Sequence, residues 1–359
     1  MRFIVLFLLV GTLVNSRAQS PRSSQDRALF FAVSNYEEDG LSHLPQPVAN
    51  VHAIAKELKR RFGFETEVVE DPTLGQIQAN LAEHKRDGLL PDRAVKATPL
   101  SGNMAFVKGG TFQMGSTSTE GGSDEKPVHS VTVSDFYIGR HEVTFEEYDA
   151  YCEATGKSKP DDEGWGRARR PVIYVSWHDA VAYCNWRSQQ EGYQPVYTIS
   201  GDRVTADWSA NGYRLPTEAE WEFAARERGK NVQFGNGKDI ARASELNFDA
   251  SESYKTRYSV VGTYRKQTVP VGSLNSPNEL NLHDMSGNVW EWCWDWYDSD
   301  YYNNSSSRNP RGSSTGSRRV LRGGSWSNGP AGLRCAYRNG GSPDRRYDDI
   351  GFRLSRTAE

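Results

Sequence analysis

The sequence predicts a loop-rich α+β fold with an aromatic core, and three observations support this. The 359-residue chain contains 33 glycines, 17 tyrosines and 10 tryptophans, a combination that favours long ordered loops packed around flat side chains. Residues 290–296 alternate four tryptophans with two acidic residues and a cysteine, as in a strand with one apolar face. Thr217 is followed three residues later by Glu220, a capping box that predicts the start of a helix.

Composition and charge limit the class of protein. Hydrophobic residues make up 36% and charged residues 25% of the chain, which is typical of a soluble and rather polar globular protein. The length allows one large domain or two modest ones. The formal net charge is −3, so we expect neither a nucleic acid nor an anionic membrane surface as a partner.

Residues 1–19 are typical of a secretory signal peptide. Arg2 supplies the positive start, Phe3–Val14 is apolar, and residues 15–19 form a small, polar cleavage region. A short membrane anchor is the alternative, but the apolar run is shorter than the roughly 20 residues that a membrane-spanning helix needs. We therefore expect an exported protein (periplasmic, at the cell surface or secreted) with no membrane span in the mature chain.

The cysteines and histidines indicate no zinc site. The chain has four cysteines, which are Cys152, Cys184, Cys293 and Cys335. An exported protein could pair them, and four cysteines allow three connectivities, among which the sequence does not choose. None lies in a Cys-x-x-Cys spacing, and the seven histidines form no ligand pair.

Residues 27–86 have the pattern of a small α/β unit. Runs at 28–33 and 65–69 are typical of strands, and residues 47–62 and 73–85 are typical of helices. This β-α-β-α order begins a doubly wound sheet.

The same unit resembles the first part of the caspase-like (C14) peptidases. The matching residues are Arg27–Tyr36, Leu44-Pro45 and Phe62–Phe64. The resemblance ends near residue 85 and no cysteine occurs before Cys152, so we expect a truncated segment that is a remnant or a docking module and not a protease. A small α/β cap unrelated to caspases is the alternative. Glycines and prolines spread through the polar residues 87–103 predict a linker.

Residues 104–357 carry a series of blocks whose order resembles that of the formylglycine-generating-enzyme (sulfatase-modifying factor) family. The blocks are Phe106–Gly115, Pro127–His129, Glu142–Thr144, Pro171–Trp177, Asp179–Cys184, Arg214–Glu222, Asp284–Trp292, Arg322–Trp326 and Gly351–Arg353. The resemblance implies an α+β fold of the C-type-lectin type, with short strands, few helices and long ordered loops.

The resemblance also implies a structural calcium ion. Its ligands would be the side chains of Asp284 and Glu291 and the carbonyl oxygens of Gly287 and Val289. Oxygen donors on a tight turn are what Ca²⁺ prefers. The alternative is that the two carboxylates cap turns and pair with arginine. A second family site would use Asn247 and Phe248, but residues 249–263 depart from the family pattern.

The oxidase chemistry of the family is not expected here. The resemblance implies that two cysteines shortly after Gly323-Gly324-Ser325 bind copper and oxidise a substrate cysteine, since Cu(I) requires thiolates. This chain has Asn328 at the first position, no sulfur among Gly329–Leu333, and Cys335 at a non-catalytic family position. We therefore assign no catalytic residue, and a family oxidoreductase that uses other ligands is an alternative.

Residues 327–349 are expected to form a ligand-binding surface. Relatives in the family include the variable proteins of diversity-generating retroelements, in which this segment is diversified, typically at adenines of AAC codons. Such codons cannot become Lys, Glu, Gln, Met or Trp. These five types make up about a sixth of the chain, so about four are expected among 23 residues, and none occurs. The expected ligand-facing positions are Ser327, Asn328, Gly329, Gly332, Tyr337, Asn339, Gly340, Gly341, Ser342, Arg345, Tyr347, Asp348 and Asp349.

Tyrosine and arginine at these positions would anchor an unknown protein or other macromolecular ligand. Asn, Ser and Asp would supply adaptable hydrogen bonds. Two alternatives stay open, namely a solvated loop that binds nothing and an assembly role mediated by the caspase-like segment.

Overall fold

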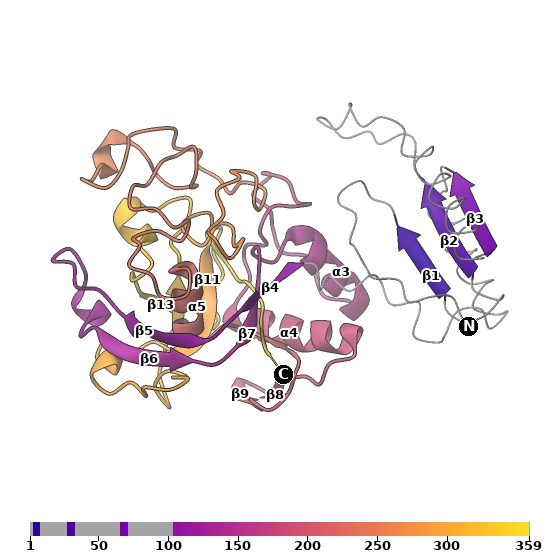
Figure 1. The fold of residues 1–359 in the computed structure, drawn as a ribbon, viewed down its shortest axis with the longest axis horizontal. Helices are drawn as coiled ribbons and strands as arrows, with labels where there is room; N and C mark the ends of the chain where they lie inside the picture. The colour runs from indigo at the N-terminus through magenta and orange to yellow at the C-terminus, as the bar shows by residue number, and fades with distance from the viewer. Residues whose placement is uncertain (1–2, 8–26, 33–64, 71–102, 359) are drawn as a thin grey trace. The chain divides into compact units, whose positions relative to one another are not determined.

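A computed structural model describes residues 3–7, 27–32, 65–70 and 103–358, and the chain divides into two units, Met1–Ala97 and Thr98–Glu359 (Figure 1). In the first unit, β1 (Phe3–Phe7), β2 (Arg27–Ala32) and β3 (Glu65–Glu70) form one parallel sheet in the order β1-β2-β3. The two strands expected from the sequence are therefore present and adjacent.

Other expectations for this unit are not settled by the structure. The helices expected at 47–62 and 73–85 lie outside the described residues. Strand β1 falls within residues 1–19, and the signal peptide expected there stays a prediction.

The second unit is built from short strands in four small sheets. One sheet has the order β10-β15-β7-β4, another β13-β12-β11-β14, and β5-β6 and β8-β9 are antiparallel pairs. The strands are β4 (Met104–Val107), β5 (Gly110–Met114), β6 (His129–Val133), β7 (Phe136–Gly139), β8 (Tyr197–Ser200), β9 (Arg203–Ala206), β10 (Tyr213–Arg214), β11 (Trp290–Trp296), β12 (Arg319–Arg322), β13 (Asn339–Gly341), β14 (Ile350–Gly351) and β15 (Ser355–Thr357). Because β15 pairs with β7 and β10, the last strand closes the unit on its first half.

Three α-helices accompany these sheets, which confirms the α+β class. They are α3 (Phe145–Thr155), α4 (Trp177–Glu191) and α5 (Glu218–Ala225), with short 3₁₀ turns at η2 (Ser123–Glu125), η3 (Glu252–Tyr254), η4 (Tyr301–Asn303) and η5 (Pro330–Leu333). Each α-helix begins with a capping box, at Thr144, Ser176 and Thr217 respectively. The helix start predicted at Thr217 is therefore confirmed.

None of the helices in the described residues is long and apolar enough to cross a membrane.

The core of the second unit is aromatic, as the composition predicts. Trp177, Trp221 and Trp292 are fully buried. Their indole N–H groups donate to the carbonyl oxygen of Cys293 at 2.9 Å, to Glu291 Oε2 at 2.7 Å and to the carbonyl oxygen of Val175 at 3.0 Å, respectively. The buried rings therefore tie distant segments together by hydrogen bonds as well as by packing.

Strand β11 is the strand expected at 290–296, but its polar face is not exposed. Glu291, Cys293 and Asp295 are as buried as the tryptophans between them. The reason is that β11 lies between β12 and β14 in its sheet and helix α5 packs against it. Carboxylates in such a place need partners, and Glu291 has them in the segment described next.

Candidate functional site

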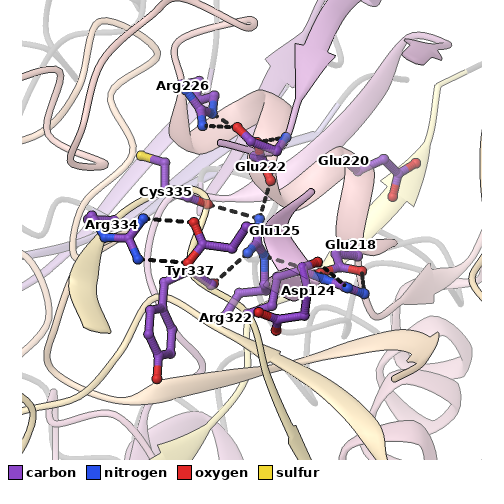
Figure 2. Close-up of polar contacts among 12 residues, drawn as sticks. Asp124, Glu125, Glu218, Glu220, Glu222, Arg226, Arg322, Arg334, Cys335 and Tyr337 are labelled. Atoms are coloured by element: carbon purple, nitrogen blue, oxygen red, sulfur yellow. Dashed lines mark hydrogen bonds and ion pairs between the residues drawn. The ribbon is translucent and has the colours of Figure 1, made fainter. Parts of the chain in front are cut away.

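The segment from Arg322 to Arg353 is anchored by four buried arginine–glutamate pairs. The pairs are Arg322–Glu222, Arg334–Glu125, Arg338–Glu218 and Arg353–Glu291. Three of them are bidentate, with N···O distances of 2.6 to 2.9 Å. Figure 2 shows Arg334 reaching Glu125 and Arg322 reaching Glu222 in one polar cluster. Breaking a pair of this kind leaves an unpaired charge buried away from water, which is costly. The four pairs therefore hold the path of the segment at four points.

The segment begins with two glycines that no other residue could replace easily. Gly323 and Gly324 have φ angles of +93° and +73°, and a Cβ on Gly324 would lie 2.7 Å from the carbonyl oxygen of Gly332. This close approach holds the start of the segment against the η5 turn. The backbone is thus rigid where the ligand-facing positions begin.

Eleven of the thirteen expected ligand-facing positions are partly or fully exposed. They are Ser327, Asn328, Gly329, Gly332, Tyr337, Asn339, Ser342, Arg345, Tyr347, Asp348 and Asp349. Gly340 and Gly341 are the exceptions and the prediction is wrong for them, since they are buried in β13 and paired with β12. A Cβ there would lie 2.7 Å from the Tyr297 ring or 2.8 Å from the Trp292 ring. These two glycines allow rings to pack and face no ligand.

Aromatic residues from outside the segment extend the exposed surface. The Trp326 ring lies 5.3 Å from that of Trp165 and 6.3 Å from that of Tyr264, measured between centroids. A groove of about 380 Å³ runs between residues 253–256 and 328–332, with Tyr337 in its wall. These neighbours could not be predicted from the sequence, because nothing in their local patterns places them beside residues 327–349.

At least four of the exposed positions, Ser327, Asn328, Asn339 and Asp349, already use their side chains in hydrogen bonds within the protein. Asn328 Oδ1 accepts hydrogen bonds from the Ser325 backbone N–H at 2.9 Å and from Ser325 Oγ at 2.7 Å. Asp349 Oδ2 lies 3.1 Å from Ser325 Oγ and 3.3 Å from Ser327 Oγ, and burial raises the pKa of this carboxyl. Asn328 and Asp349 therefore shape the surface, while Ser342, Arg345 and Tyr347 are exposed on it and the Arg345 guanidinium lies 4.0 Å from the centroid of the Tyr347 ring.

Comparison with known proteins identifies the family. The family described as Sulfatase-modifying factor enzyme 1-like domain matches residues 91–358, and the caspase domain family matches residues 25–89. The chain belongs to the sulfatase-modifying factor family. Both resemblances stated from the sequence motifs are thereby confirmed.

The proteins that this chain resembles have names that refer to different functions. The formylglycine-generating enzyme of Streptomyces coelicolor is 29% identical over 303 residues, which cover 70% of this chain and 88% of the enzyme. The chaperone protein LppX of Paenibacillus barcinonensis is 36% identical over 220 residues, or 56% of this chain and 74% of that protein. The serine/threonine-protein kinase pkn1 of Chlamydia caviae is 32% identical over 286 residues, or 73% of this chain, but this chain spans only 39% of the kinase.

A solved structure with the same fold is that of Treponema denticola variable protein 1. Its TM-score to this chain is 0.57 and its sequence identity 28%, with 70% of this chain and 94% of the variable protein covered. The C-type-lectin-like fold expected from the motifs is therefore confirmed.

The cysteines of this family member have the properties of packing residues. All four are buried and unpaired. Burial raises the pKa of the Cys335 thiol to about 12, and that of Cys293 well above its usual value. Burial therefore disfavours the thiolate form of these two cysteines.

The expected calcium ligands lie in a buried acidic region. Glu142 and Glu291 are buried and Asp284 is partly buried near one guanidinium, that of Arg353, and burial raises the pKa of Asp284 to about 6 and that of Glu142 well above its usual value. Glu142 Oε2 has no hydrogen-bond partner. Both oxygens of Glu291, in contrast, accept hydrogen bonds from Arg353 at 2.6 Å. This is the arginine pairing that the sequence left open as the alternative.

The same region has no complete set of metal ligands among the described residues. In the part of the chain that the structure describes, no group of three or more His, Cys, Asp or Glu side chains converges on a point that could hold a metal ion. Three carboxyl groups face one guanidinium group, so the charge of the region favours a bound cation. In this structure, however, both oxygens of Glu291 accept hydrogen bonds from Arg353, so Glu291 is not available as a metal ligand.

Proposed function

We propose that this protein is an exported binding protein, whose contact surface consists of the eleven exposed positions in residues 327–349. The observation that carries this proposal is the difference between the buried and the exposed residues of the segment. Buried arginines hold its backbone, while Ser, Asn, Gly, Asp, Tyr and Arg lie on its surface. Rigid aromatic anchors combined with small adaptable polar groups on a fixed backbone are typical of protein surfaces that bind varied ligands.

The similarity to Treponema denticola variable protein 1 supports the same proposal. The absence of Lys, Glu, Gln, Met and Trp from residues 327–349 is what diversification of AAC codons would leave. We propose that the segment is diversified and that its partner is a protein or another macromolecule. The absence of cysteine from residues 328–333 supports a binding role over the oxidase chemistry of the family.

Sequencing the gene from independent isolates of its source tests the proposal. We expect codon differences to concentrate at the eleven exposed positions. Codons for the buried residues of the same segment, such as Arg334, Cys335, Arg338 and Gly341, should be identical, because a change there strands a charge or collides with a ring. Differences spread evenly over the domain, or an invariant segment with no second copy of its coding region nearby, would contradict it.

We propose in addition a structural calcium ion at Asp284, Gly287, Val289 and Glu291. The excess of buried carboxyl groups over guanidinium groups and the unpartnered Glu142 Oε2 support a cation in this region. Binding would require Glu291 to turn from Arg353, or the ion to take its oxygens from the other groups.

Elemental analysis of the purified protein is the measurement. We expect about one calcium per chain, removed by EDTA with a fall in Tm of several degrees and restored by calcium chloride. Asp284→Asn, which the φ of +57° at this position tolerates, should lose the calcium, whereas Asp300→Asn at an exposed site should keep it. Stoichiometric copper or iron in place of calcium would overturn the proposal and favour a family oxidoreductase.

A further inference from the structure

A hollow of about 500 Å³ lies between the loop of residues 115–119 and residues 231–233, and none of the eleven exposed positions lines it. Arg226 and Arg257 line it, and Arg334 and Ala336 reach its wall from the inner side of the anchored segment. Its volume is in the range of small-molecule sites. Neither the binding surface proposed above nor the buried acidic region uses it.

The guanidinium of Arg226 is only partly satisfied by the protein. Its Nε donates to Glu222 Oε1 at 2.9 Å (Figure 2), and its Nη2 donates to the carbonyl oxygen of Gly115 at 2.9 Å, which leaves Nη1 as a donor for a ligand in the hollow. The other carboxylate oxygen of Glu222 accepts a hydrogen bond from the fully buried Arg322. Glu222 is thus shared between Arg226 and Arg322, although Arg322 also lies 3.7 Å from Glu218, and of these two cations Arg226 is the one that lines the hollow.

A second cation at the hollow is free to move. The Arg257 side chain is 72% exposed and is held only through Nε, which donates to Glu120 Oε1 at 3.0 Å. Its two terminal nitrogens are therefore available to a ligand. Two guanidinium groups with unused donors favour an oxyanion, because charge-assisted hydrogen bonds from arginine are the strongest the protein can offer to it.

The remaining lining is polar and largely uncharged. Hydroxyl and amide side chains make up most of it, namely those of Gln113, Ser116, Thr117, Ser118, Thr119, Asn231 and Gln233, with Val128 and Val232 as apolar side chains beside them. Asp239 also lines the hollow and accepts a hydrogen bond from the Gln233 backbone N–H. A carboxylate beside donors and hydroxyls favours ligand O–H groups and disfavours a second anionic group.

We infer that this hollow binds an acidic saccharide unit, which combines several hydroxyl groups with a single carboxylate or sulfate. The oxyanion lies on Arg226 and Arg257, and the hydroxyls on the hydroxyl, amide and carboxylate groups of the lining. A ligand site here is independent of the binding surface at residues 327–349, so either can fail without the other.

Titration calorimetry on the full chain with four probes tests this inference. The probes are glucuronate, glucose 6-sulfate, glucose and inorganic sulfate. We expect at least one of the two acidic sugars to bind at least tenfold more tightly than glucose and than inorganic sulfate, and the stronger of the two identifies the oxyanion. If inorganic sulfate bound as tightly as the acidic sugars, the hollow would be a simple anion site and the saccharide assignment would be overturned. Heats indistinguishable from dilution for both acidic sugars would overturn it as well.

Matched variants locate the binding. Arg257→Ala and Asn231→Asp change exposed residues and should leave the Tm unchanged. The first should weaken the acidic sugar at least fivefold by removing a cation, and the second should weaken it by adding a negative charge. Arg228→Ala is the control, since this exposed guanidinium donates to the carbonyl oxygen of Lys108 and does not line the hollow. Equal effects of all three variants would show that the sugar binds elsewhere and would overturn the inference.

Discussion

Replacing Arg353 by methionine is expected to destabilise the domain by about 3–5 kcal/mol, the usual cost of removing one partner of a buried ion pair. Arg353 is fully buried and donates two hydrogen bonds of 2.6 Å to Glu291. It also donates to the carbonyl oxygens of Gly139 and His283, at 2.9 and 3.0 Å. Methionine fills the space of the aliphatic stem but leaves the Glu291 carboxylate without a cation.

Equilibrium denaturation in EDTA, with calcium therefore absent, measures this effect. The double variant Glu291→Gln/Arg353→Met should recover at least half of the lost stability, because removal of both charges is far less costly than removal of one. Glutamine can still accept the Trp221 indole hydrogen bond that Glu291 accepts at 2.7 Å. Arg356→Met, at a partly exposed position of β15, should cost little. A single variant as stable as the wild type would contradict the anchoring role of the pair.

The four buried arginine–glutamate pairs also show which features of the fold can be predicted from the sequence and which cannot. Residues 322–326 and 351–353 belong to the motif blocks that resemble the family, and all of them except Trp326 are buried. The partners were not predictable, because the glutamates lie 62 to 209 residues away along the chain. Nothing in the local spacing of charges indicates which glutamate meets which arginine once the chain has folded.

A similar limit explains the two errors of detail in the segment and in β11. Gly340 and Gly341 lie in a polar, glycine-rich run, and composition alone does not separate a glycine that faces a ligand from one that makes room for Trp292 or Tyr297. The alternation of residues 290–296 correctly predicts a strand. It does not reveal that both faces are covered, since a buried acidic residue looks the same in sequence as an exposed one.

Replacing Asp295 by asparagine is expected to stabilise the domain at alkaline pH and to leave it nearly unchanged at pH 4. Asp295 Oδ2 accepts a hydrogen bond of 2.8 Å from the backbone N–H of Glu218, at the start of α5. Burial and the nearby carboxylates of Glu218 and Glu220 raise the pKa of this carboxyl to about 8, against the opposing effects of the Glu218 backbone N–H and of Arg338. The folded protein therefore holds a proton on Asp295 in a pH range where the unfolded chain, with an ordinary aspartate pKa near 4, has released it.

The sign of the pH dependence follows from this difference in bound protons. Between about pH 4 and pH 8 the folded state binds more protons at Asp295 than the unfolded state does, so this group lowers the free energy of unfolding as the pH rises. The loss reaches its full size, on the order of 5 kcal/mol for four pH units, above the folded-state pKa. Asparagine resembles the protonated acid, keeps an acceptor for the Glu218 N–H and does not titrate.

The difference in free energy of unfolding between Asp295→Asn and the wild type, measured from pH 4 to pH 9, isolates this one group. We expect the difference to start near zero, to grow steadily in favour of asparagine and to level off near pH 8. Asp202→Asn, at an exposed turn between β8 and β9, should give a flat difference over the same range. A wild type that is more stable than Asp295→Asn at pH 8 would show that the folded state instead stabilises the ionised carboxylate, with Arg319 and Arg338 as the cations within reach.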